Sequence, residues 1–229
     1  PKTLLVFAIV LCALLNLYVI SISGGRSSLF MYIFYLIFLF IFLKVIFYKK
    51  FFFISVISLI LVSILLINQN VMERVVKKTF FEFTGKSISD KKDPYDTDDF
   101  HQLEKLPIFI FSPAHTNYYV ASIKIFDDHK VFGAGPKSFR KLCKDKRYSY
   151  GKYTCTTHPH NYYIQLLAET GLLGVSFLIT SYLSLLFLFY KNLFNSDISP
   201  NKRNFKMILI GALLVNYFPL MPTGNFFNN

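Results

Sequence analysis

Five long apolar stretches constrain the fold of this chain more than any other feature of its sequence. They cover residues 4–21, 29–48, 51–67, 172–190 and 207–220. A helix needs about 20 residues to cross about 30 Å of hydrocarbon, and most of the stretches approach or reach that length. We expect the last one to be cut short or kinked by Pro219 and Pro222. Buried helices of a large soluble protein are the alternative, but the scarcity of charges favours membrane spans, and the sequence predicts an all-α, polytopic integral membrane protein.

The composition agrees with a membrane protein. Hydrophobic residues make up 53% of the chain, with 27 Phe, 15 Tyr and no Trp, and the mean hydropathy is +0.42. These values exclude a disordered or fibrous chain and argue against a soluble enzyme. The chain starts at Pro1 rather than at a methionine. We therefore expect it to be the C-terminal portion of a longer protein that has further spans.

The basic residues of the short connections predict the orientation of the spans. Two lysines follow the second stretch, and the connection after the fourth carries several cations against a single acid, Asp197. The positive-inside rule assigns both connections to the cytoplasm. Alternation of sides then places residues 68–171 in the periplasm of a bacterial inner membrane. The sequence thus predicts three transmembrane helices in residues 1–67, a periplasmic loop segment in 68–171 and two transmembrane helices in 172–229, the last one truncated.

The net charge of +12 does not require a nucleic-acid partner. Residues 68–171 hold 16 Lys and Arg against 12 Asp and Glu, whereas the rest of the chain holds 9 against 1. Most of the positive excess therefore lies on the spans and short connections, where it sets the orientation. We expect a lipid bilayer around the chain and no nucleic acid.

The long outer segment has predicted helices of its own. Apolar residues recur at helical spacing, and helices are expected over residues 68–83, 114–128, 137–143 and 160–170. The first of these is amphipathic and suits the membrane surface. The last is expected to end at Gly171, which is a good C-terminal cap. Residues 87–104 are charged and poor in large apolar side chains, so we expect a mobile surface loop there.

Two of the three cysteines lie in this outer segment, twelve positions apart. Because the periplasm is oxidising, we hypothesise a disulfide between Cys143 and Cys155, which would stabilise the small loop that it closes by about 2–3 kcal/mol. The alternative joins these cysteines to His158 and His160 in a tetrahedral zinc site. The spacing matches no familiar zinc finger, so the disulfide is the preferred interpretation and no metal is expected.

The most informative string in the outer segment begins at His160. It reads His-Asn, nine further residues and then Gly-x-x-Gly-Val, with the glycines at positions 171 and 174. Two other strings precede it, Ser-Gly-Gly-Arg-Ser at residues 23–27 and Phe-Gly-Ala-Gly-Pro-Lys-Ser-Phe-Arg at 132–140. Together these strings resemble the signature of the O-antigen ligase and O-antigen polymerase superfamily. The resemblance covers most of the chain from residue 21 onward.

The resemblance implies a function and a set of partners. Members of the superfamily are membrane glycosyltransferases that move a glycan from undecaprenyl diphosphate onto an acceptor hydroxyl in cell-surface polysaccharide assembly. The acceptor would be the lipid A core for a ligase, as in lipopolysaccharide biosynthesis, or another glycan for a polymerase. A GT-C-like fold is implied, and no metal or cofactor is expected. A transporter or flippase for the same lipid-linked glycan is the alternative, and a structural membrane protein is a further one.

The chemistry of such a transfer suggests a role for His160. A sugar leaving a lipid diphosphate needs cations around the departing phosphates, and the incoming hydroxyl needs a base with a pKa near neutrality. His160 is the predicted catalytic base, because it stands at the start of an expected helix directly above the membrane. A surface histidine with only local hydrogen bonds is the alternative. His158 is expected to be structural or to support His160.

Four residues are predicted to bind the diphosphate. Arg26 lies between two spans on the outer face, where a guanidinium can pair with phosphate oxygens, although an interfacial anchor is the alternative. Arg140 and Lys137 follow a glycine turn, with a solvated surface as their alternative. By the resemblance, His115 falls where the family has an arginine, which puts the second cation of the site in doubt. Arg140 or Arg74 could supply it instead.

Overall fold

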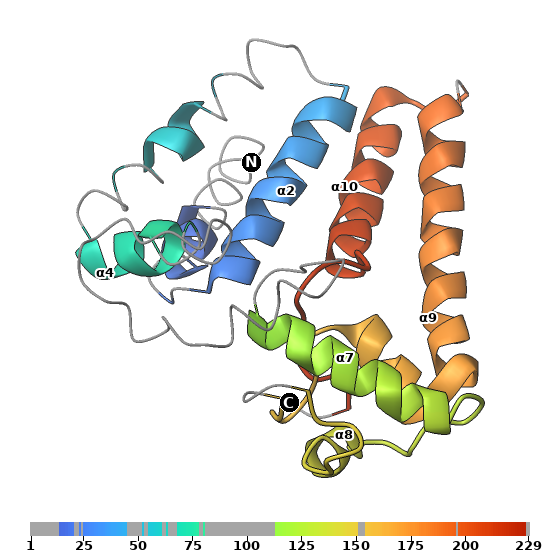
Figure 1. The fold of residues 1–229 in the computed structure, drawn as a ribbon. Helices are drawn as coiled ribbons and strands as arrows, with labels where there is room; N and C mark the ends of the chain where they lie inside the picture. Colours follow the sequence, from blue (N-terminus) through green and yellow to red (C-terminus); the bar gives the residue numbers. More distant parts are fainter. Residues whose placement is uncertain are drawn as a thin grey trace. The chain divides into compact units, whose positions relative to one another are not determined.

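All regular secondary structure in the described part of the chain is helical. The computed structural model describes residues 14–20, 23, 25–44, 52, 55–60, 63, 68–77, 80, 113–150, 154–195 and 197–227. Within these residues there is no strand, and the helices are α2 (Arg26–Phe42), α4 (Gln69–Met72), the π-helix η1 (Glu73–Lys77), α7 (Pro113–Asp128), α8 (Phe139–Leu142), α9 (Tyr162–Phe194) and α10 (Pro200–Asn216) (Figure 1). The all-α prediction is confirmed for this part of the chain.

The chain divides into two compact units. The first consists of residues 1–79 and 185–216, and the second of residues 80–184 and 217–229. Helix α9 begins in the second unit and ends in the first. These two units are defined by contacts within the chain and not by the position of a membrane. The assignment of residues to spans and to an outer segment therefore stays a prediction.

In the first unit, helix α10 packs against α2 through small and aromatic side chains. A side chain at Gly211 would lie 2.2 Å from the ring of Phe38, so glycine is what lets α10 approach that ring. Phe38 also contacts Phe189 of α9, with ring centroids 5.6 Å apart. The hydroxyl of Tyr35 donates to the carbonyl oxygen of Ile208 at 3.0 Å. Aromatic packing therefore joins the helices of this unit.

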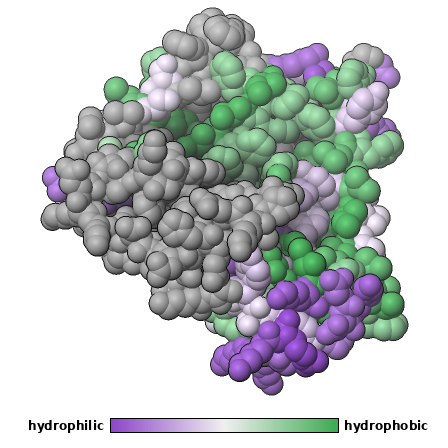
Figure 2. Space-filling model, in the orientation of Figure 1, coloured by the Kyte–Doolittle hydropathy of each residue, from purple (hydrophilic) through white to green (hydrophobic). Residues whose placement is uncertain are grey.

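Helix α9 is the one helix among the described residues that is long and apolar enough to cross a membrane. Only 11% of its most apolar stretch is buried, so it is not the core helix of a soluble protein. Figure 2 shows hydrophobic residues over much of α9, whereas hydrophilic residues gather around α8 in the second unit. Helix α2 is also apolar but has 17 residues.

The other predicted spans are described only in part. The expected stretch 207–220 corresponds to α10, which begins earlier, at Pro200, and ends at Asn216. Proline suits the first turn of a helix, and the later Pro219 cannot continue one, which explains both shifts. Much of the first and third expected stretches lies outside the described residues. The polytopic arrangement therefore stays a prediction.

The helices expected in the outer segment are present where the structure describes it. Helix α7 matches the expected residues 114–128 almost to the residue, and α8 forms the central part of the expected 137–143. The predicted amphipathic helix appears as α4 and η1, and its end is described only in part. The predicted loop at 87–104 lies outside the described residues.

Helix α9 is interrupted at Gly171, where the backbone has φ 64° and ψ −160°. A continuous helix would pair the N–H groups of Leu172 and Leu173 with carbonyls four residues earlier. Here they donate instead to the carbonyls of Lys130 at 2.8 Å and Val131 at 3.2 Å. The sequence correctly placed a break at Gly171, and a second helical stretch starts directly after it, where the expected stretch 172–190 begins.

The carbonyls released by this break are used by the same loop. The oxygen of Ala168 accepts from the N–H of Ala134 at 3.0 Å, and that of Glu169 accepts from Gly135 at 2.9 Å. Four backbone hydrogen bonds therefore join residues 130–135 to 168–173, and we call this set the glycine interlock. It leaves none of these backbone groups buried without a partner.

Two glycines make the glycine interlock possible. A Cβ atom at Gly133 would lie 2.2 Å from the nitrogen of Thr170, and one at Gly171 would lie 2.4 Å from the carbonyl oxygen of Val131. Both glycines also have positive φ angles, 68° and 64°, which other residues rarely adopt. Any side chain at either position therefore pushes the two backbones apart.

Gly133→Ala should destabilise the protein by about 1–3 kcal/mol, because the added methyl group collides with the backbone of Thr170. Gly224→Ala is the matched control, since no atom lies within 4 Å of its added Cβ. Thermal unfolding of the detergent-solubilised variants measures the difference. Equal melting temperatures for the two variants would contradict the described packing.

Candidate functional site

A pair of histidines precedes α9 in the second unit. The ring centroids of His158 and His160 are 4.1 Å apart, with the buried Pro159 between them in the chain. His160 has a φ of 60°, which is uncommon for a residue with a side chain and persists only where its surroundings hold it. Its carbonyl oxygen accepts from the N–H of Thr223 at 2.8 Å. The C-terminal segment thus holds His160 in place.

Asn161, the next residue, is 3% exposed and fixes the start of α9. Its Oδ1 accepts from the N–H of Ile164 at 3.1 Å, which is the bond of a helix N-cap. Its Nδ2 donates to the carbonyls of Pro219 at 2.7 Å and Met221 at 3.2 Å. The asparagine of the His-Asn string therefore orients His160 through the backbone. An Asn just before an apolar helix is a recognisable signal of this cap in the sequence. No feature of the sequence indicates that the same Asn binds the carbonyls of Pro219 and Met221.

Helix α7 lines the other side of the histidine pair. The rings of His115 and Tyr118 each lie 5.7 Å from the ring of His160, centroid to centroid. Tyr119 is buried, and burial raises its pKa to about 12, although the nearby side chain of Asn161 opposes that rise. The structure therefore brings the predicted His115 next to the predicted base.

Both histidines of the pair are held in the neutral form at pH 7. Burial lowers the pKa of His160 below its ordinary value, and the proximity of His158 lowers it further, because two positive charges so close together repel each other. Burial also lowers the pKa of His158; the nearby backbone of Thr223 opposes this shift, and the positive charge of Arg140 adds to it. A neutral imidazole can accept a proton, so either ring can act as a base.

The residues that follow Gly133 form a cationic turn, defined here as residues 134–142. It encloses a hollow of about 510 Å³ lined by Ala134, Pro136, Lys137, Ser138, Arg140, Lys141 and Leu142. Lys137 lies in the left-handed region, with a φ of 61°. The buried Oγ of Ser138 and Nε of Arg140 have no hydrogen-bond partner among the described residues. Three cations and two unused polar atoms suit an anion such as a phosphate.

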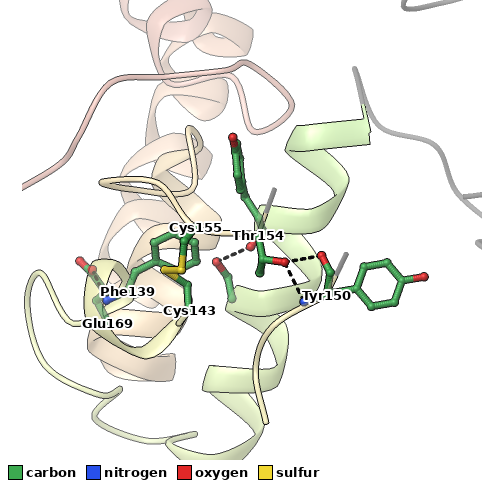
Figure 3. The surroundings of a disulfide bond; sticks show 8 residues. Phe139, Cys143, Tyr150, Thr154, Cys155 and Glu169 are labelled. Carbon is green, nitrogen blue, oxygen red and sulfur yellow. Dashed lines mark hydrogen bonds between the residues drawn. A yellow bond between two sulfur atoms is a disulfide. The ribbon is translucent and has the colours of Figure 1, made fainter. Parts of the chain in front are cut away.

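A disulfide joins the end of the cationic turn to the segment before the histidine pair. Cys143 and Cys155, the two cysteines paired from the sequence, are bonded in the structure, with Cα atoms 5.2 Å apart (Figure 3). Cys143 is buried with Phe139 in a core that also contains Ala121 and Ala168. The disulfide uses the two sulfur atoms that the alternative zinc site needs. No group of three metal-binding side chains occurs in the described part of the chain.

The predicted site residues fall into both units. His115, Lys137, Arg140 and His160 belong to the second unit, and Arg140 acts electrostatically on His158. Arg26 is the first residue of α2 in the first unit. The side chain of Arg74 lies outside the described residues. The predicted roles of all these residues in binding and catalysis stay predictions.

The fold defines a class of protein: an all-helical protein with a helix that is long and apolar enough to cross a membrane. Neutral histidines and a cationic turn lie at the start of that helix. The family model described as O-antigen ligase matches residues 11–179, which is more than half of the chain. The chain therefore belongs to the O-antigen ligase family. No curated protein and no solved structure gave a significant match.

Arg140→Met should raise the pKa of His158, because loss of a nearby positive charge favours the protonated ring. NMR titration of protein labelled at histidine measures both rings, whose pKa values should lie below 6.5 before the change. Lys144→Met, which removes an exposed cation, should leave them unchanged. An unaltered His158 pKa in the Arg140 variant would contradict the described electrostatics.

Proposed function

We propose that this protein transfers a glycan from undecaprenyl diphosphate to an acceptor hydroxyl in the bacterial inner membrane. Membership in the O-antigen ligase family supports a glycosyltransferase-like role in polysaccharide assembly at a membrane. The lipid-linked donor, an acceptor on the lipid A core or on another glycan, and a periplasmic position for residues 68–171 are parts of this proposal. So are the polytopic arrangement and the GT-C-like fold.

The observation that carries the proposal is the neutral histidine pair beside a cation. In the reaction, an acceptor oxygen bonds to the anomeric carbon, and the bond from that carbon to the diphosphate oxygen breaks. His160 takes the proton of the attacking hydroxyl, which requires a neutral ring, and burial keeps it neutral. The nearby His158 lowers the pKa of His160, and its ring lies beside that of His160 at a tilt of 53°. His158 is the residue that supports the base.

The leaving diphosphate gains negative charge as the bond breaks. Lys137 and Arg140 of the cationic turn are proposed to stabilise that charge, since fixed cations are most effective where charge develops. The unused Nε of Arg140 supports this role. His115 lies beside His160 and is proposed as a weaker phosphate contact. Arg26, in the first unit, stays a sequence-based proposal for the same role.

His160→Ala should reduce glycan transfer by at least about 100-fold, because the attacking hydroxyl loses its base. The matched control is His129→Ala, which removes an exposed histidine at the end of the α7 segment. Wild-type activity should also fall as the pH drops below 6.5 and through the lowered pKa of His160, since the protonated ring cannot accept a proton. Transfer by purified full-length protein from a lipid-linked donor to candidate acceptors is the measurement.

Three outcomes of that assay separate the functions. Transfer by the wild type and by the His129 variant, but not by the His160 variant, supports the proposal. Full transfer by an abundant, membrane-inserted His160 variant would contradict the role of the base. Movement of the lipid-linked glycan across vesicles without any transfer would identify a transporter instead.

A further inference from the structure

The carboxylate of Glu169 is fully buried at the point where α9 meets the cationic turn. Its Oε1 accepts from the backbone N–H of Phe139 at 3.0 Å, and Figure 3 shows these two residues side by side. Its Oε2 accepts from Nε2 of Gln165 at 3.0 Å. None of the ion pairs in the described part of the chain includes Glu169. A buried carboxylate without an ion pair is costly, so its presence calls for a specific role.

Glu169 holds the cationic turn at two places. Its carboxylate binds the N–H of Phe139, and its backbone carbonyl binds the N–H of Gly135 at 2.9 Å. Lys137 lies between the two bonded residues, Gly135 and Phe139, and Arg140 directly follows Phe139. One residue of α9 therefore fixes both ends of the backbone segment that carries the cations.

The turn needs such support. The left-handed conformation of Lys137 is strained and is kept only where neighbouring bonds hold it. Within the turn itself, the N–H of Ser138 donates to the carbonyl of Gly135 at 3.2 Å. Glu169 adds the contacts that tie this turn to a long helix.

The cationic turn also presents a hydroxyl that is available to a ligand. Ser138 stands just before α8, where a serine commonly accepts a bond from the first turn of the helix. It makes no such bond, and its backbone is helical, with φ −72° and ψ −31°, rather than extended as at a usual N-cap. The buried Oγ of Ser138 lines the hollow beside Lys137 and Arg140. The hollow thus keeps a hydroxyl donor together with its cations.

We propose that Glu169 is a positioning residue for the lipid diphosphate, acting through the backbone of the cationic turn. It holds Lys137, Ser138 and Arg140 in the arrangement that binds phosphate oxygens. This inference rests on the proposed function, because that function supplies the diphosphate. Glu169 itself does not contact the ligand.

The test uses undecaprenyl diphosphate without sugar, which binds as the leaving group and requires no transfer. Glu169→Ala in the full-length protein should weaken its binding about tenfold, the usual effect of losing a charge-assisted hydrogen bond. Gln165→Ala is the matched control, because Gln165 shares the buried network yet binds Asn225 and the N–H of Phe226 rather than the turn. That variant should bind within about threefold of the wild type even if its melting temperature falls equally.

A double-mutant cycle shows whether Glu169 acts through the cations. In a protein that already carries Lys137→Met and Arg140→Met, adding Glu169→Ala should cause little further loss of binding, because the groups it positions are absent. An unchanged tenfold loss in that background would overturn the inference. Wild-type affinity in Glu169→Ala alone, or an equal loss in Gln165→Ala, would overturn it as well.

The same experiment separates this inference from the proposed reaction. If wild-type protein does not bind undecaprenyl diphosphate, the diphosphate site is wrong and the role of Glu169 falls with it. If binding follows the expected pattern while no lipid-linked donor supports transfer, the role of Glu169 stands and the reaction is wrong.

Discussion

The glycine interlock is the interaction on which the second unit depends. Breaking α9 at Gly171 frees two N–H groups and two carbonyls, and the loop at residues 130–135 satisfies all four. Gly133 permits the approach because it has no side chain. A long apolar helix is thereby joined to a polar turn, and the four backbone groups of the interlock all have partners.

This junction brings different chemical groups to the start of one helix. The neutral histidines precede α9, and the cationic turn follows directly from the interlocked loop. The carboxylate of Glu169 fixes the cationic turn. The side-chain amide of Asn161 fixes the backbone next to His160. For the proposed glycan transfer, a base and cations held on rigid elements would be an advantage, because neither has to reorganise as charge develops.

Local patterns in the sequence were enough to predict the helices and the strings that carry the site. Spacing of apolar residues gave α7, and the glycine at position 171 gave a break in the helix. The partners of buried polar groups were not predictable in this way. Glu169 binds a backbone group 30 residues away, and Asn161 binds groups about 60 residues away. Such pairs depend on which backbone groups the fold leaves without a partner. The spacing of residues along the sequence does not predict those groups.

Amide hydrogen exchange of the full-length protein tests most directly whether the glycine interlock holds the site together. The amides of Ala134, Gly135, Leu172 and Leu173 should exchange as slowly as those inside α9. They should also open together, because each of the two segments of the interlock protects the other. Rapid exchange at Ala134 and Gly135 while the α9 amides stay protected would contradict this account.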